Sequence, residues 1–214
     1  MQEDTLKQFL PATESWFRKT FGEPTKIQRE AWPAIADGKH VLVSAPTGTG
    51  KTLSAFLVFI DQLGGLAERG ELKEELYVIY VSPLKSLAGD IRENLRKPLE
   101  GIGAEAPGES KAESRPGNPS IGQIQAAIRT GDTPQKERQR MVKHPPHILI
   151  ITPESLYLML TSKSGRQVLK TAKAIILDEL HALIDTKRGA HLMLSVARLD
   201  KLCGRRLQRI GLSA

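Results

Sequence analysis

Short apolar runs alternate along the chain with longer stretches that have helical periodicity. Six of these runs are rich in Val and Ile, and several are apolar at every position: 40–44, 76–82, 124–130, 147–152, 174–178 and 207–213. Strands that are apolar on both faces and separated by helices are typical of a parallel sheet covered on both sides. The pattern therefore predicts an α/β fold with a doubly wound, mostly parallel sheet. Right-handed connections would bring all strand C-terminal ends to one edge, where such sheets bind ligands.

One polar segment interrupts this alternation. Residues 101–120 are dominated by Gly, Pro, Ser, Glu and Ala, with Ile102 as their large apolar residue. This composition predicts a flexible surface loop between a helix and a strand. We expect residues 1–24 to form an N-terminal helical extension and residues 25–214 to form the α/β domain.

Composition and charge narrow the class of protein. The chain has 214 residues and a net charge of +7, which favours a polyanionic partner such as nucleic acid without establishing one. Cys203 is the single cysteine, so an internal disulfide is excluded and a reducing cytoplasm fits. The N-terminus lacks a signal-peptide pattern, and the longest apolar run, 55–60, is far shorter than the ~20 residues that span a bilayer. We expect a cytoplasmic protein with no membrane contact.

The segment APTGTGKT, residues 45–52, lies between a predicted strand and a predicted helix, which is the context of a phosphate-binding loop. Gly48 and Gly50 would allow backbone N–H groups to turn inward around phosphate oxygens. Lys51 would reach the β- and γ-phosphates of ATP, and the Thr52 hydroxyl would ligate Mg²⁺. The predicted ATP-binding residues of the loop are Thr47, Gly48, Thr49, Gly50, Lys51 and Thr52. An ordinary Gly-containing turn is the lesser alternative.

Two acidic residues follow the strand predicted at 174–178, in the sequence DELH. Asp178 could hold Mg²⁺ through its water shell, and Glu179 could polarise the attacking water. Taken alone, these acids could equally open a helix, where they favour the positive end of the helix dipole. The phosphate-binding loop upstream favours the catalytic interpretation. It predicts that Lys51 and Asp178 face each other across the ends of neighbouring strands.

The loop together with DELH resembles the motifs of superfamily 2 helicases, the group that contains the DEAD-box and DExH proteins. Further segments occur in the order found in the large helicase-related family: FGEPTKIQREAWPAI, SPLKSLAGDI, RTGDTPQKERQRM, ITPESLYLMLTS, DELHALIDTKRGAHLMLSVARLDKL and RIGLSA. RTGDTPQ, TPESLYLMLTS and KRGAHL are the most specific, because DEAD-box proteins lack them. The resemblance covers about residues 12–214 and implies a RecA-like ATP-binding domain. Ala45 replaces the usual first glycine of the loop, as in one helicase superfamily, and Leu180 replaces a more usual Val or Ile.

The resemblance also implies roles for residues outside these two motifs. Phe21 would stack on adenine, and Gln28 would hydrogen-bond the adenine edge. His181 would couple the site to a partner domain. Ser213 and Ala214 would begin a Ser-Ala-Thr motif that relays nucleotide state to the grip on nucleic acid.

Gln28 has a second interpretation that the residues themselves carry. Thr25 and Gln28 have the spacing of a capping box, in which the glutamine side chain bonds back to the N–H group of the N-cap residue. One side chain cannot easily serve both purposes. The resemblance favours adenine recognition over capping.

Three predicted strands run into a hydroxyl residue followed by proline, at 82–83, 133–134 and 152–153. Ser or Thr as N-cap with Pro at the first helical position is how a helix begins. Three helix N-termini along one sheet edge would also present N–H groups to successive phosphates of a single strand. The resemblance assigns strand-gripping motifs to the same segments, whereas the basic residues between 138 and 143 fit a solvated helix face. The predicted nucleic-acid-binding residues are Pro83, Lys85, Thr130, Gly131, Asp132, Thr152, Pro153 and Glu154.

Together these observations predict the ATP-binding half of an ATP-dependent helicase that uses ATP and Mg²⁺ and binds single-stranded DNA or RNA. The alternatives are a translocase that remodels duplex without separating it, a small-molecule kinase, and a binding module with little turnover. The sequence RIGLSA predicts that a second RecA-like domain of the full-length protein follows Ala214 and supplies arginine fingers. The resemblance further implies 3′-to-5′ translocation and a role in DNA repair or RNA handling.

Overall fold

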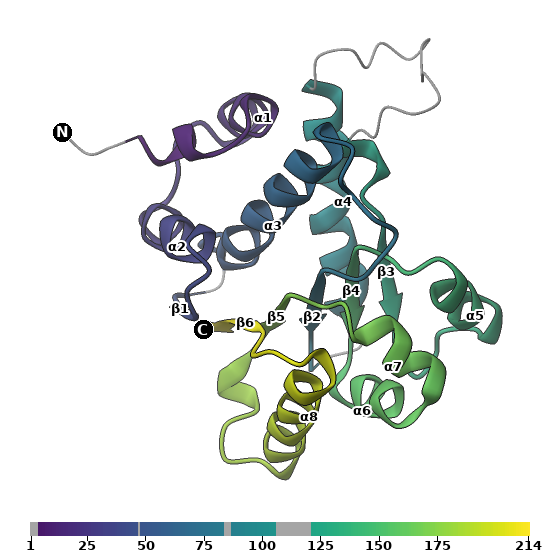
Figure 1. The fold of residues 1–214 in the computed structure, drawn as a ribbon. Helices are drawn as coiled ribbons and strands as arrows, with labels where there is room; N and C mark the ends of the chain where they lie inside the picture. Colours follow the sequence, from purple (N-terminus) through teal and green to yellow (C-terminus); the bar gives the residue numbers. More distant parts are fainter. Residues whose placement is uncertain (1–3, 47, 84–86, 106–120) are drawn as a thin grey trace.

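Six parallel strands form one sheet between two layers of helices in the computed structural model, which describes residues 4–46, 48–83, 87–105 and 121–214 (Figure 1). The strands are β1 (Val41–Ser44), β2 (Val78–Val81), β3 (Ala126–Arg129), β4 (Ile148–Ile151), β5 (Ala174–Leu177) and β6 (Gln208–Ser213). The α-helices are α1 (Pro11–Phe21), α2 (Lys26–Ala36), α3 (Lys51–Glu68), α4 (Leu87–Glu105), α5 (Gln135–Lys143), α6 (Pro153–Thr161), α7 (Lys163–Leu169) and α8 (Lys187–Cys203). Short 3₁₀ helices are η1 (Thr5–Gln8), η2 (Ile121–Gln123) and η3 (Leu180–Ala182). Each strand lies inside its predicted range, so the predicted α/β fold is confirmed.

The strands are ordered β1-β6-β5-β2-β4-β3, and every neighbouring pair is parallel. Their C-terminal ends therefore lie at one edge of the sheet, as the pattern predicted. The prediction that the strands of Lys51 and Asp178 are neighbours is wrong, because β6 lies between β1 and β5. The apolar residues of β6 suit its position between two other strands, where Ile210 and Leu212 are fully buried.

Alternating side chains on the buried strands fill two hydrophobic cores. On β2, Val78 and Tyr80 face a core shared with α1, α2, α3 and α4. Ile79 and Val81 face the opposite core, which is shared with α5, α6, α7 and α8. Figure 1 shows the two layers, with purple to blue helices above the sheet and green to yellow helices below it. Cover on both faces explains why the strands are continuous apolar runs.

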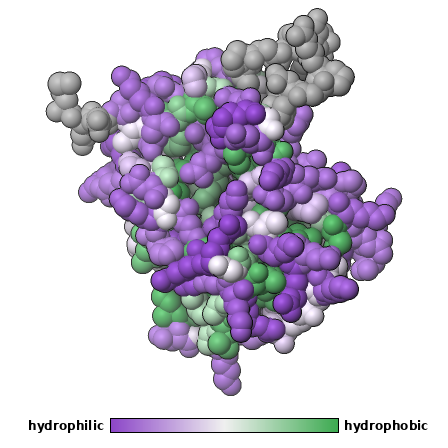
Figure 2. Space-filling view, in the orientation of Figure 1, coloured by the Kyte–Doolittle hydropathy of each residue, from purple (hydrophilic) through white to green (hydrophobic). Residues whose placement is uncertain are grey.

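The molecular surface is mainly hydrophilic on the face that Figure 2 shows, where hydrophobic side chains appear in separate patches. Among the residues whose exposure the structure describes, the exposed large hydrophobic ones are Phe21, Leu42, Leu158, Ile184, Met193 and Leu194. None of the described helices combines the length and hydropathy that crossing a bilayer requires.

The N-terminal segment is helical and belongs to the same core as the sheet. Phe9 and Phe17 pack edge-on against Trp32 of α2, with ring centroids 4.9 and 5.3 Å apart. α1 also packs against α4. The segment is thus an integral layer of the fold, while the domain boundary at residue 24 stays a prediction.

The predicted loop at 101–120 begins too early, because α4 continues to Glu105. Ile102 is fully buried in the core. Gly101 lies against the Trp16 indole, where an added Cβ would come within 2.1 Å of Nε1. Glu105 closes the helix with an ion pair to Lys19 at 2.6 Å. In residues 101–105 the small side chains therefore belong to a helix that packs closely on α1. Residues 106–120 lie outside the described part of the chain.

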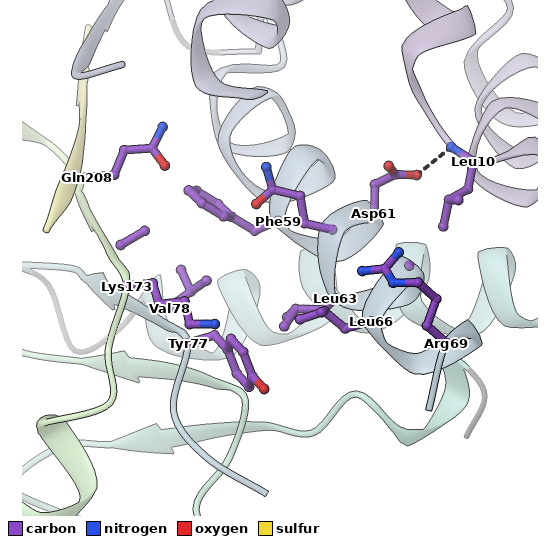
Figure 3. Close-up of a pocket in the computed structure, with 13 residues that line it drawn as sticks. Leu10, Phe59, Asp61, Leu63, Leu66, Arg69, Tyr77, Val78, Lys173 and Gln208 are labelled. Carbon is purple, nitrogen blue, oxygen red and sulfur yellow. Dashed lines mark hydrogen bonds between the residues drawn. The ribbon is translucent and has the colours of Figure 1, made fainter. Parts of the chain in front are cut away.

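A long-range hydrogen bond fixes the start of α1. The Asp61 carboxylate on α3 accepts the backbone N–H of Leu10 at 2.8 Å (Figure 3). The bond lies in the wall of a cavity of about 410 Å³ between α3 and the N-terminal ends of β2, β5 and β6. Burial raises the pKa of Asp61, and the negative charge of Glu68 acts in the same direction, whereas the Leu10 bond lowers it. This cavity lies at the sheet edge opposite to the predicted site.

We expect Asp61→Asn to change how stability depends on pH. Folding raises the pKa of Asp61 above its ordinary value of 3.8, so the folded state holds this proton more tightly than the unfolded state. The free energy of unfolding therefore falls as pH rises from the unfolded pKa through the folded one. Asparagine keeps an oxygen acceptor for Leu10 but cannot ionise, so its stability relative to the unchanged chain should increase from about pH 3 to about pH 7. Urea unfolding at both pH values measures this, and a difference that is constant with pH would contradict it.

Candidate functional site

The phosphate-binding loop has the backbone that its glycines predicted. Gly48 and Gly50 have φ values of 81° and 86°, in the left-handed region, and Gly50 is the N-cap of α3. A larger residue at Gly50 would be strained by this backbone conformation, and its Cβ, 2.7 Å from the Gln28 amide nitrogen, would displace that amide. The first N–H groups of α3 are thus directed toward the loop, an arrangement suited to phosphate. The Lys51 ammonium donates to the Ala45 carbonyl, and Thr47 lies outside the described residues.

The acidic pair follows β5 directly. Asp178 is 7% exposed, and one of its oxygens accepts the Glu179 backbone N–H at 2.9 Å. Burial raises the pKa of Asp178, and hydrogen bonding from Tyr80 opposes the rise. Glu179 has φ 51° and ψ 44°, a left-handed conformation that costs energy for a residue with a side chain. The fold therefore holds Glu179 in a strained position beside a desolvated carboxylate.

Tyr80 is a residue of this site that the sequence analysis missed. Its hydroxyl donates to the Asp178 carboxylate from β2, the strand next to β5. Burial raises the pKa of Tyr80, and the neighbouring Asp178 charge raises it further. The sequence did contain a signal for this contact, namely a tyrosine inside a strand predicted to be apolar on both faces. A buried tyrosine hydroxyl usually has a hydrogen-bond partner.

A cleft of about 840 Å³ brings the predicted nucleotide-binding groups together. Its wall includes the predicted residues Phe21, Gln28, Gly48, Thr49, Gly50, Lys51, Thr52, Asp178 and Glu179. Phe21 lines the cleft and is 53% exposed, with its ring 5.6 Å from Trp16 and 5.1 Å from Phe17 between centroids. Lys51 and Asp178 interact electrostatically although a strand separates β1 from β5.

Gln28 forms the capping box that had been the second interpretation. Its Oε1 accepts the Thr25 N–H at 2.9 Å, and the Thr25 hydroxyl accepts the Gln28 N–H at 3.4 Å. The cap uses one end of the amide. Oε1 completes the cap, while Nε2 faces Gly50 in the wall of the cleft. Adenine recognition by Gln28 stays a prediction.

The predicted donors for a divalent cation, the side-chain oxygen atoms of Thr52 and Asp178, both lie in the cleft wall. Mg²⁺ prefers such oxygen ligands and usually keeps several waters, with one or two protein carboxylates and substrate phosphates completing its shell. The residues present fit this pattern. Within the described residues, no group of three or more His, Cys, Asp or Glu could form an all-protein metal centre.

His181 joins the acidic pair to the end of the chain. Its Nε2 lies 3.2 Å from a Glu179 carboxylate oxygen. Its Nδ1 accepts the Ala214 N–H at 3.2 Å and lies 3.4 Å from the Ser213 hydroxyl. The three predicted coupling residues are therefore in direct contact with one another, and their coupling role stays a prediction.

The remaining predicted site residues that the structure describes lie where β2, β4 and β3 end, side by side in the sheet. Thr152 caps α6 by accepting the Ser155 N–H at 3.4 Å, with Pro153 at the first helical position, as predicted. The other two predicted helix starts are wrong. α4 begins at Leu87, beyond Pro83. Lys85 lies outside the described residues.

Thr133 closes a turn instead of capping α5. Its hydroxyl accepts the Thr130 N–H at 2.8 Å, and the Thr130 hydroxyl accepts the Asp132 N–H at 3.3 Å. Arg138, predicted to be a solvated helix residue, donates to the Gly131 and Thr133 carbonyls at 2.8 and 2.7 Å. Hydroxyl groups and this guanidinium therefore shape the turn at 130–133.

Glu154 has a cationic partner in α8. The Arg188 guanidinium donates to both of its carboxylate oxygens, at 2.6 and 3.1 Å. The bond to Arg188 lowers the pKa of Glu154, so the carboxylate is charged at neutral pH. The pair ties the segment TPES to KRGAHL, and nucleic-acid binding by Glu154 stays a prediction.

Comparison with known proteins places this geometry in a family. The family model for the DEAD/DEAH box helicase matches residues 25–214. The chain is 48% identical over 211 residues to the Lhr helicase/probable uracil glycosylase of Mycolicibacterium smegmatis, covering 99% of this chain and 13% of that protein. It is 49% identical over 204 residues to the ATP-dependent helicase Lhr-Core of Methanothermobacter thermautotrophicus, covering 95% and 22%. The chain thus spans less than a quarter of either relative.

Solved structures agree with these relatives. The structure of Mycobacterium smegmatis helicase Lhr bound to ssDNA and AMP-PNP matches with a TM-score of 0.86 and 47% identity, over 99% of this chain and 25% of that one. The DEAD-box helicase Mss116 bound to ssRNA and UDP-BeF matches with a TM-score of 0.78 over 99% and 41%, and at 19% identity it supports the fold alone. Because the family model covers residues 25–214, the chain belongs to the DEAD/DEAH box helicase family.

Proposed function

We propose that this chain is the ATP-binding half of an ATP-dependent helicase that couples ATP hydrolysis to movement along a nucleic-acid strand. The observation that carries the proposal is the cleft in which Lys51 and Thr52 meet Asp178 and Glu179. The similar Lhr structure with ssDNA and AMP-PNP supports the same function. Family membership argues against the small-molecule kinase alternative.

The cleft residues would divide the chemistry of hydrolysis among themselves. Lys51 would leave the Ala45 carbonyl and neutralise the β- and γ-phosphates. Thr52 and Asp178 would hold Mg²⁺, which when bound would neutralise charge that develops on the phosphates. Glu179 would orient the attacking water and accept its proton. The strained backbone at Glu179 supports this role, because strain of this kind concentrates at active sites.

Adenine would bind at the outer end of the cleft. The exposed ring of Phe21 would offer a stacking surface, and the Nε2 group of Gln28 would offer a donor to a ring nitrogen. The capping box supports this role for Gln28, because it fixes the amide in one orientation. Thr25 would thereby act on the nucleotide through the side chain that it holds.

Nucleic acid would bind along the ends of β2, β4 and β3, beside the ATP cleft at the same sheet edge. The N-terminus of α6 and the turn at 130–133 would contact phosphates, with Lys85 adding a direct charge. Such contacts suit single-stranded DNA or RNA without base readout. A cytoplasmic location, a role in DNA repair and a second RecA-like domain belong to the same proposal.

Lys51→Ala should abolish measurable ATP binding without unfolding the chain. Lys51 lies at the start of α3, and its ammonium contacts a loop carbonyl and no core residue, so the core should be unaffected. Binding of a fluorescent ATP analogue and the thermal midpoint would be measured together. Lys163→Ala, at an exposed position that starts α7, is the matched control and should leave both unchanged. Undiminished binding by Lys51→Ala would refute the assignment.

Binding to single strands should be weak, strongly salt-dependent and nearly independent of sequence. Contacts to phosphates release counterions, so log affinity should fall with log salt at about −0.7 per phosphate neutralised. Lys85→Ala should reduce this slope by about 0.7, whereas Lys163→Ala should leave it unchanged. Fluorescence anisotropy with several oligonucleotide sequences at a series of salt concentrations measures both. A salt-independent or sharply sequence-specific affinity would contradict the proposed surface.

The chain alone should hydrolyse ATP very slowly and should not separate a duplex. Among the described residues that line the cleft, Lys51 and Lys97 are the cations and no arginine is present. An arginine finger is worth about 10³–10⁵ in turnover in other P-loop enzymes. ATPase and strand-separation assays on this chain and on a longer protein that contains it would measure the difference. Robust unwinding by the 214 residues alone would contradict the prediction.

A further inference from the structure

Tyr80 occupies a position below the cleft that packing alone does not explain. It is fully buried on β2, and its ring stacks on Phe56 of α3 with centroids 4.8 Å apart and planes at 18°. Phe56 lies four residues after Thr52, so both side chains lie on the same face of α3. The ring therefore holds β2 at a set position relative to α3, the helix that carries Thr52.

The Tyr80 hydroxyl completes the hydrogen bonding of Asp178. The Glu179 N–H bonds to Oδ1 of Asp178, and the Tyr80 hydroxyl bonds to Oδ2. With a donor on each oxygen, rotation of the carboxylate group is restricted. The stacked ring also holds Tyr80 against α3, the helix that carries Thr52. Tyr80 thus bonds to Asp178 and packs on the helix of Thr52, the two residues predicted to offer oxygen atoms to a divalent cation.

We propose that Tyr80 is a positioning residue for the Mg²⁺ site, acting through Asp178 without touching the nucleotide. The inference rests on the proposed function, since it concerns the cation that would accompany ATP. Partners that orient metal ligands are worth about 10–100-fold in metal affinity or activity when they are removed. Tyr80 has the geometry of such a partner, because its ring is buried and stacked on Phe56 while its hydroxyl bonds to Asp178.

A purely structural role would be the competing explanation. Removing the hydroxyl leaves a buried Asp178 oxygen short of a donor, and this alone lowers stability. A fall in the thermal midpoint therefore does not distinguish the two roles. Dependence on Mg²⁺ does, because a structural defect would weaken nucleotide binding equally with and without the cation.

The experiment uses Tyr80→Phe, which keeps the ring and its stacking on Phe56. Binding of a fluorescent ATP analogue to this chain would be followed in EDTA and during a Mg²⁺ titration. We expect the affinity in EDTA to be unchanged, whereas the Mg²⁺ concentration for half-maximal effect rises about tenfold or more. Mn²⁺ electron paramagnetic resonance with the same nucleotide should show a matching loss of bound metal.

Tyr77→Phe is the matched control. Tyr77 is also buried, and its hydroxyl accepts the Lys73 N–H at 3.1 Å, at the other end of β2 from the cleft. Its loss should leave Mg²⁺ dependence unchanged. A double-mutant cycle with Asp178→Asn adds a second test, since Tyr80→Phe should have little further effect on Mg²⁺ dependence once Asp178 cannot respond.

The outcomes separate this inference from the proposed function. If Tyr80→Phe has the same Mg²⁺ dependence as Tyr77→Phe, or loses affinity equally in EDTA, the positioning role is overturned. If both tyrosine variants and the unchanged chain bind no nucleotide at any Mg²⁺ concentration, the proposed function fails first. Binding that Lys51→Ala abolishes and that responds selectively to Tyr80→Phe supports both.

Discussion

The parallel pairing of β6 with both β1 and β5 is the constraint on which the site depends. β1 lies at the edge of the described sheet and pairs with β6, in register from Val41 with Ile210 to Ser44 with Ser213. The Ala45 N–H continues this ladder by bonding to the Ser213 carbonyl at 3.1 Å. The phosphate-binding loop therefore starts from a strand held in place by the last residues of the chain. On its other side β6 pairs with β5, which carries Asp178.

The same strand order divides the edge into two regions. The loop after β1 and the acidic pair after β5 line the cleft, and the ends of β2, β4 and β3 form the predicted nucleic-acid surface. β2 adjoins both regions, with Tyr80 bonded toward Asp178 and Pro83 just beyond its end. β2 and β5 are joined by a ladder of backbone hydrogen bonds. A displacement of β5 would therefore act on β2 directly. Proximity of the two regions is thus a property of the topology.

The features that could be predicted from the sequence are those that depend on a residue and its immediate neighbours. Gly48 and Gly50 needed left-handed backbone, and the Thr152–Pro153 pair contained its own capping group. The failures have a common physical cause, which is that the predicted signal met a competing contact, either within a neighbouring turn or with a distant helix. Thr133 bonds within a turn that Arg138 stabilises. Residues 101–105 stay helical because Trp16 packs on Gly101. Strand order, and with it the bond between Tyr80 and Asp178, depends on pairing that no local pattern encodes.

The contacts of β6 give the coupling prediction a physical basis. Gly211 lets two leucines approach the strand, since a Cβ there would lie 2.5 Å from Leu180 and 3.0 Å from Leu42. β6 is thereby packed against η3, which follows the acidic pair, and against β1, which precedes the phosphate-binding loop. His181 adds a polar contact between Glu179 and the Ala214 N–H. A displacement at the end of β6 would therefore reach the loop through the backbone ladder and Glu179 through the histidine. If the coupling prediction holds, these two routes from one strand would let a change at the phosphates and a change at the end of β6 act on each other.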